Sequence, residues 1–210
     1  MTRIDGTIDL FLPTDLVDLA QPGDEDAARG SYEDLARQVF PTMEPAARGQ
    51  LVDALMGWRT LLADRGVVLH GLVAVPADGD VAAANWHLLA GVVDVPEAGE
   101  LDAGVVCERY LRQKVDPDRV YTESFATDMG WGVGVITEVD VVPPPELLPL
   151  FSVPPRVGLA AALAAPPDSE LGLLVLGFAF ELEHHLEMAG VVAAIAGRSR
   201  LAAVAAGDRP

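Results

Sequence analysis

The sequence predicts an α+β fold, a mainly antiparallel sheet with helices packed on it, and four observations support this prediction. The runs Val157–Ala164 and Leu171–Phe180 are apolar, and the turn between them is rich in proline, aspartate and serine. The second run is apolar on both faces, which is typical of a central strand covered on both sides. At Glu181 the hydrophobic period changes from two to about 3.6, which predicts a long C-terminal helix. Hairpin connections dominate the rest of the predicted order, as in antiparallel sheets.

The C-terminal helix is expected over residues 181–200, with one face rich in small residues. This face contains Leu182, Leu186, Ala189, Ala193 and Ala196. Their spacing matches one side of a helix. Because small residues allow a helix to lie close to a sheet, we expect this face to pack on the apolar strands.

The N-terminal part is predicted to contain a strand, a loop and a short helix. Residues 4–12 alternate weakly, and Pro13 ends the strand. Residues 21–30 (QPGDEDAARG) are polar and acidic, which favours a loop. Ser31 followed by Asp34 resembles a capping box, so a short helix is expected to begin there.

A second helix is predicted to begin at Pro45, a residue suited to the first helical position, and to end at Gly66. Its apolar stripe consists of Leu51, Leu55, Trp58 and Leu62. A tryptophan in such a stripe is more often a core residue than a binding residue, so we expect Trp58 to pack on the sheet.

The middle of the chain reads as two hairpins separated by a helix. Strands are expected at 67–75 and 81–95, joined at Asp78-Gly79, and at 119–127 and 131–142. The intervening helix is expected over 102–114. Its inner stripe includes Cys107, which we interpret as a small buried hydrophobic residue. A long surface connection follows over 143–155.

This order of elements resembles the Mog1/PsbP-like sandwich. The resemblance rests on the helix at 101–114, the hairpin at 156–180 and the helix at 181–200. It implies a non-catalytic binding or accessory protein, because members of that fold group mostly act in that way. No functional residue of the group can be transferred to this sequence, because no motif matches.

Length and composition favour one sizeable core. The chain has 210 residues, of which 50% are hydrophobic. The expected organisation is an N-terminal strand and acidic loop over 1–30, a single α+β domain over 31–200 and a frayed tail over 201–210. No apolar run reaches 18 residues, the N-terminus has no basic region, and a single cysteine excludes an internal disulfide. We therefore expect a soluble cytoplasmic protein.

Charge narrows the classes of partner. With 32 acidic and 14 basic side chains the net charge is −18. Nucleic-acid binding depends on Lys and Arg that neutralise phosphates, and anionic membranes repel an acidic surface, so neither partner is expected. The acidity favours either simple solubility or a partner protein with a basic surface.

A row of glycines marks one face of a predicted strand. Gly130, Gly132, Gly134, Glu138 and Asp140 share this face, opposite the apolar side chains. Glycine in a strand often marks the close approach of a helix, a ligand or another backbone. Either a helix of the same chain covers this strip or an external partner does. These five residues form the predicted partner-binding surface.

The segment Glu181–Glu187 offers an alternative site. Glu181 and His184 stand three residues apart, which is the spacing by which one helix presents a carboxylate and an imidazole to a metal, and His185 follows. No second such pair exists, and the zinc signature HExxH is absent. The structural alternative is that the glutamates favour the positive end of the helix dipole.

No catalytic constellation emerges from the sequence. It has no GxSxG motif, and no acid is placed to orient a Ser-His or Cys-His pair. Asn85-Trp86-His87 and His70 would line a small pocket if their strands pair as expected.

Three hypotheses follow. The first is a non-catalytic interaction domain without a cofactor, which docks a protein partner, basic in character, through its sheet face or acidic surface. The second is a small-ligand or metal-binding domain or enzyme that uses Glu181, His184 and His185. The third is a structural homo-oligomer, suggested by the apolar content and the alanine-rich final helix.

Overall fold

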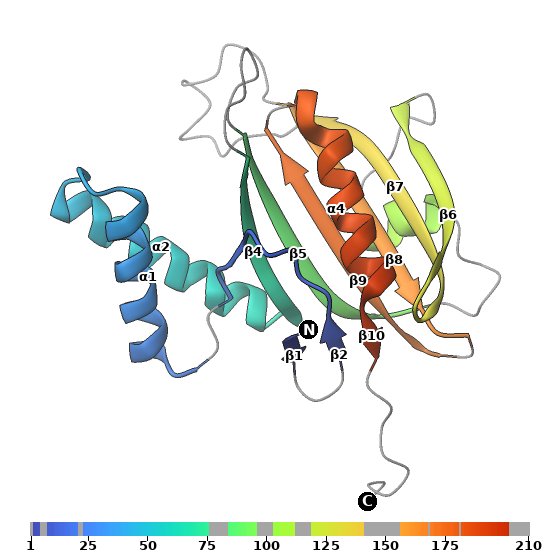
Figure 1. Ribbon diagram of the computed structural model, residues 1–210, viewed down its shortest axis with the longest axis horizontal. Helices are drawn as coiled ribbons and strands as arrows, with labels where there is room; N and C mark the ends of the chain where they lie inside the picture. Colours follow the sequence, from blue (N-terminus) through green and yellow to red (C-terminus); the bar gives the residue numbers. More distant parts are fainter. Residues whose placement is uncertain are drawn as a thin grey trace, which may run out of the picture.

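The computed structural model describes residues 2–4, 8–20, 23–75, 84–95, 103–111, 119–140, 156–167, 169–180 and 182–201. Within these ranges the chain forms a large antiparallel sheet with one helix across its front face, a shorter helical segment behind it and a helical hairpin at one side (Figure 1). The predicted α+β fold with a long C-terminal helix is confirmed. The predicted turn at Asp78-Gly79 and the connection 143–155 lie outside the described residues.

Seven strands form the main sheet, and every neighbouring pair is antiparallel. In spatial order they are β3 (Leu16–Asp18), β4 (Val67–Val75), β5 (Ala84–Asp94), β9 (Leu171–Ala179), β8 (Arg156–Ala165), β7 (Gly130–Asp140) and β6 (Tyr121–Thr127). The apolar run at 171–180 is therefore the middle strand, as predicted. Leu173 and Leu174 point to opposite faces and belong to two different core clusters, and both are buried, so the strand is covered on both faces.

The long C-terminal helix α4 (His185–Arg198) follows a 3₁₀ turn, η4 (Leu182–His184), and lies across β8 and β9. Its buried face consists of Met188, Ala189, Val192, Ile195 and Ala196. The prediction is confirmed for Ala189 and Ala196, which are buried, and it is wrong for Leu186, which is 62% exposed. The larger apolar side chains Met188, Val192 and Ile195 occupy the neighbouring side of the same helix, and their burial turns Leu186 outward.

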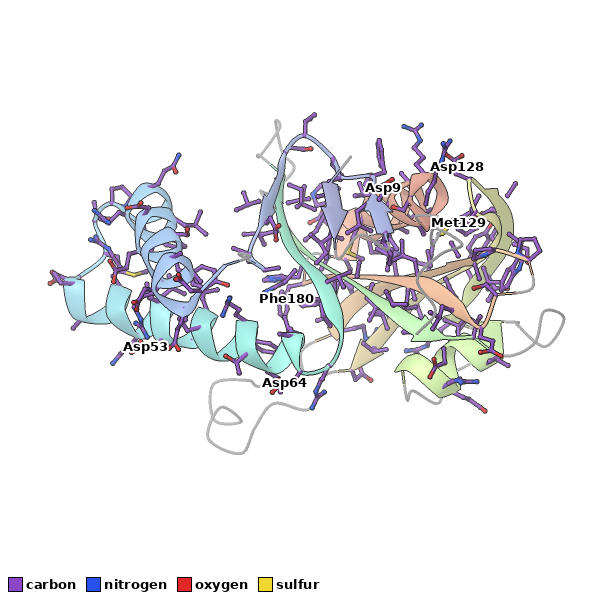
Figure 2. The ribbon with its side chains drawn as sticks, turned by 90° about the horizontal axis from the view of Figure 1, so that it is seen from below. Asp9, Asp53, Asp64, Asp128, Met129 and Phe180 are labelled. Atoms are coloured by element: carbon purple, nitrogen blue, oxygen red, sulfur yellow. The ribbon has the colours of Figure 1, made fainter. Side chains whose placement is uncertain are left out.

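The opposite face of the sheet is covered by α3 (Ala103–Val105), which continues as the π-helical turn η1 (Val106–Leu111). Val106 and Cys107 are buried there against Val133 and Leu163. The prediction that Cys107 is a small buried hydrophobic residue is confirmed. Figure 2 shows α4 and this helical segment on opposite sides of the sheet.

The helices α1 (Glu25–Val39) and α2 (Pro45–Ala63) form a hairpin that projects beyond β4 (Figures 1 and 2). They have a small core of their own, which contains Ala28, Tyr32, Ala36, Val52 and Met56. Because α2 packs on α1 through Val52 and Met56, Trp58 is 53% exposed, and its predicted packing on the sheet is wrong. The start of α2 at Pro45 is confirmed, as is the stop at Gly66, which has a φ of 72°.

The first helix begins earlier than predicted. Asp24 is its N-cap, and the Asp24 carboxylate accepts a hydrogen bond of 2.8 Å from the amide of Ala27. The expected loop over 21–30 is therefore helical from Glu25 onward, and Ser31 lies inside the helix. Two acidic residues in the first turn favour this start through the helix dipole.

The two ends of the chain meet in a small second sheet. Strand β2 (Ile8–Leu10) pairs with both β1 (Thr2–Ile4) and β10 (Arg200–Leu201). Ile8 and Leu10 belong to the same core as α4, so the N-terminal strand packs with the main domain. Residues 202–210 of the predicted tail lie outside the described residues. No helix in the described part of the chain is long and apolar enough to cross a bilayer.

Candidate functional site: a groove beside the C-terminal helix

A groove runs along α4 where the sheet extends beyond the helix. Because α4 lies over β8 and β9, the same face of β7 and β6 continues beside it (Figure 1). The groove holds about 160 Å³, and a second hollow of about 420 Å³ adjoins it. The two share Tyr121, Ile136 and Leu186, so they form one continuous depression.

The floor of the groove follows from strand alternation and register. Gly134 and Ile136 lie on the face of β7 that is turned toward α4. In the antiparallel pairing, Ala162 of β8 stands beside Gly134, and Ala160 stands beside Ile136. Of these four neighbouring floor positions, three carry glycine or alanine and one carries isoleucine. The small side chains leave the hollow open.

The wall is formed by α4 itself. Leu186, Gly190 and Ala193 line the groove at positions i, i+4 and i+7 of one helical face. A Cβ atom added to Gly190 would meet nothing within 4 Å. The helix therefore presents a ridge of small residues to the open side, with an exposed leucine at one end.

The predicted glycine strip is only partly open. Phe125 of β6 lies over it: a Cβ on Gly132 would come within 3.1 Å of the ring, and a Cβ on Gly134 within 3.4 Å. Gly130, with a φ of 136°, sits at the turn beside Pro167. An aromatic side chain from the neighbouring strand thus fills most of the strip, and Gly134 is the glycine of the three that lines the groove.

The two predicted acids lie on the same strand, beyond the glycines. Arg156 of β8 contacts both, with 3.4 Å from Nη1 to Glu138 Oε2 and 3.0 Å from Nε to Asp140 Oδ1. The hydrogen bond to Asp140 and the nearby carboxylates raise the pKa of Arg156. Glu138 also lines the second hollow, together with His185.

A further carboxylate at the rim, Glu123, was not singled out from the sequence. It lines the groove from β6, and it forms no ion pair with any described residue. Its contact there is the hydroxyl of Tyr121 at 3.5 Å, which is long for a hydrogen bond. Tyr121 is 59% exposed and faces Leu186 across the mouth. Among the described residues, Glu123 thus lines the groove without an ion pair, and Arg119 lines the adjoining hollow.

The histidines of the alternative metal site diverge. His184 is buried, and its ring lies 6.5 Å from that of Trp86. Nδ1 of His185 contacts the carbonyl oxygen of Leu182. Glu181 lies outside the described residues, and the described part of the chain contains no group of three potential metal ligands. The metal site at Glu181, His184 and His185 stays a prediction.

The other predicted pocket is split between the two faces of the sheet. His70 and His87 lie on the face opposite α4, with ring centres 6.3 Å apart. Trp86 lies in the core on the α4 side. The expectation that His70 and His87 stand on paired strands is confirmed, whereas Trp86 does not join them. The side chain of Asn85 is outside the described residues.

Comparison with protein-family models, with curated proteins and with solved structures gives no match. The resemblance to the Mog1/PsbP-like sandwich therefore stays a prediction, and the geometry of the groove alone carries the functional argument.

Proposed function

We propose that the protein is a non-catalytic interaction domain that binds a basic amphipathic helix of a partner protein in the groove beside α4. One observation carries this proposal: α4 covers only part of its face of the sheet and leaves an apolar groove over β6 and β7. We also propose a cytoplasmic location, supported by a single, buried cysteine, Cys107.

The width of the open face suits a helix. Neighbouring strands lie about 4.8 Å apart, so the midline of β6 and β7 is roughly 10 Å from the midline of β8 and β9 under α4. Packed helices have axes about 8–10 Å apart. A second helix laid over β6 and β7 would thus contact the sheet and α4 at the same time.

The shape of the wall supports the same occupant. Gly190 and Ala193 present little bulk, which permits close approach of another helix. Leu186 and Tyr121 at the mouth offer apolar surface to the side chains of the incoming helix. Recognition would follow the helix-in-groove mode, in which apolar anchors recur at i, i+3, i+4 and i+7.

Charge defines the polar face of the partner. Glu123 at the rim forms no ion pair with a described residue, and the whole chain carries a net charge of −18. Lysine or arginine on the partner helix would meet this carboxylate. The surrounding negative field would increase the association rate at low salt.

The test uses a labelled Lys/Leu peptide of roughly 16 residues, which spans about 24 Å as a helix. We expect it to bind the wild-type protein in fluorescence anisotropy, and to bind more weakly when its sequence is scrambled to remove the apolar face. Gly190→Phe should fill the groove and weaken binding by about tenfold or more. Gly57→Phe is the matched control, because Gly57 also lies in a helix with nothing within 4 Å of an added Cβ.

The electrostatic part is tested separately. Glu123→Gln should weaken binding at low salt and reduce its salt dependence, while Glu170→Gln, an exposed acid outside the groove, should do neither. Equal binding by Gly190→Phe and Gly57→Phe would overturn the proposal. If the mass of the wild-type protein in solution exceeds that of one chain, and Gly190→Phe but not Gly57→Phe lowers it, then a second copy of this chain occupies the groove instead.

A further inference from the structure

We propose a second site on the opposite face of the sheet, where His70 and His87 bind a late transition-metal ion such as Zn²⁺ or Cu²⁺. This site is independent of the groove and of the segment Glu181–Glu187. Two of the four histidines of the chain are brought together there from strands β4 and β5.

The sheet register places the two imidazoles on one face. His70 pairs with Leu89 and His87 pairs with Leu72, so the histidines are diagonal neighbours on adjacent strands. Diagonal neighbours on one face of an antiparallel pair lie within reach of long side chains. Their ring centres are 6.3 Å apart with an angle of 23° between the ring planes. Both side chains are half-buried, so the pair remains open to solvent.

The ring of His87 is held by a third strand. Phe178 of β9 stacks on it with ring centres 4.8 Å apart and an interplanar angle of 2°. His87 and Phe178 are also register partners, so the strand pairing enforces the stack. Metal ligands need a fixed orientation, and here an aromatic neighbour limits the rotation of the ring.

The protonation state suits a ligand. Burial lowers the pKa of His70, and the positive charge that His87 would carry lowers it further. The lowered pKa favours the neutral imidazole, which is the form that binds a metal.

The distance between the rings is compatible with a shared ion. With a Zn–N bond of about 2.0–2.1 Å, two rings that share a tetrahedral ion have centres roughly 5 Å apart. The observed 6.3 Å thus requires the rings to approach by roughly 1 Å. Because Phe178 holds the ring of His87, the movement falls to the side chain of His70.

Ligand chemistry selects the class of metal. Imidazole suits Zn²⁺, Cu²⁺ and Ni²⁺, whereas Ca²⁺ and Mg²⁺ prefer oxygen ligands. Among the described residues the two imidazoles have no third potential ligand grouped with them. The net charge of −18 attracts cations to the surface.

The test is calorimetric titration of the full chain with Zn²⁺ alone at neutral pH. We expect one ion to bind per chain, and either His70→Gln or His87→Gln to weaken binding by about tenfold or more. His185→Gln is the matched control and should leave binding unchanged. Wild-type protein that binds no Zn²⁺, or binding that survives both variants and is lost in His185→Gln, would overturn the proposal.

A second measurement needs no variant. Substoichiometric Cu²⁺ should broaden the imidazole NMR signals of His70 and His87 before those of His184 and His185. Broadening that begins at His184 or His185 would contradict the assignment.

Discussion

The hydroxyl of Tyr32, at the centre of α1, donates a hydrogen bond to the main-chain carbonyl of Leu19, just after β3. Tyr32 is buried, and burial raises the pKa of its hydroxyl. The bond joins the projecting helical hairpin to the edge of the main sheet. Within the hairpin, a hydrogen bond of 2.6 Å from Arg59 Nη2 on α2 to the carbonyl oxygen of Gly23 joins α2 to the start of α1.

Tyr32→Phe should lower the free energy of unfolding by about 1–2 kcal/mol, because it removes one partner of a buried hydrogen bond and leaves the Leu19 carbonyl unpaired. Urea denaturation measures this change. Tyr121→Phe, which alters an exposed hydroxyl, is the control and should change stability by less than about 0.5 kcal/mol. Equal stability of Tyr32→Phe and wild type would refute this anchoring role.

Gly177 of β9 allows α4 to lie close to the sheet. A Cβ at this position would lie 2.6 Å from Val192 Cγ2 and 3.2 Å from Leu88 Cδ2. Gly177→Ala should therefore destabilise the protein by about 1–3 kcal/mol through overpacking. Thermal melting is the measurement.

The matched control for this prediction is Gly190→Ala on the open side of α4. An added Cβ there meets nothing within 4 Å, and alanine favours a helix interior over glycine by about 0.5–1 kcal/mol. The two glycine-to-alanine changes should thus shift the melting temperature in opposite directions. A stabilising Gly177→Ala would contradict the close approach of α4 to β9.

The lowered pKa of His70 predicts a dependence of stability on pH. Folded His70 resists the proton that the unfolded chain accepts below its ordinary pKa of 6.5. Its contribution to stability is therefore fully present above pH 6.5, and it is lost as the pH falls from 6.5 toward the lowered folded pKa. His70→Gln should flatten this part of the profile. Urea unfolding at stepped pH gives the comparison, and parallel profiles for the two proteins would disprove it.

Regular, strongly apolar elements could be predicted from the sequence. The strand 67–75, the antiparallel pair β8 and β9 and the middle position of β9 follow from hydrophobic pattern, proline and turn chemistry. These features act locally, or they concern strands buried on both faces, so the sequence pattern contains them.

The predictions from the sequence are wrong where the buried face or the start of a helix depends on the elements that the helix contacts. Trp58 fits an apolar stripe, but α2 packs on α1 through Val52 and Met56. Leu186 is turned outward because Met188, Val192 and Ile195 occupy the side of α4 that faces the sheet. Asp24 and Ser31 are both good caps, and the acidic first turn after Asp24 favours the earlier start.

The candidate groove could be predicted only in part. Strand alternation placed Gly134 and Glu138 on one face, and both line the depression. Phe125 over Gly132 and the pairing of Arg156 with Glu138 depend on the order of β6, β7 and β8 in space. Tyr121, Glu123 and Phe125 occupy every second position of β6 and therefore share one face. This pattern indicates a groove only when β6 is known to be an edge strand, which the sequence does not show.

The central claim is that the surface beside α4 receives a helix, and an amide NMR titration of the wild-type protein with the Lys/Leu peptide tests it most directly. We predict shifts concentrated in β6, in β7 and on the Leu186–Ala193 side of α4, with η1 and the α1–α2 hairpin unaffected. Shifts confined to the α1–α2 hairpin, or spread evenly over acidic surface residues, would contradict the claim.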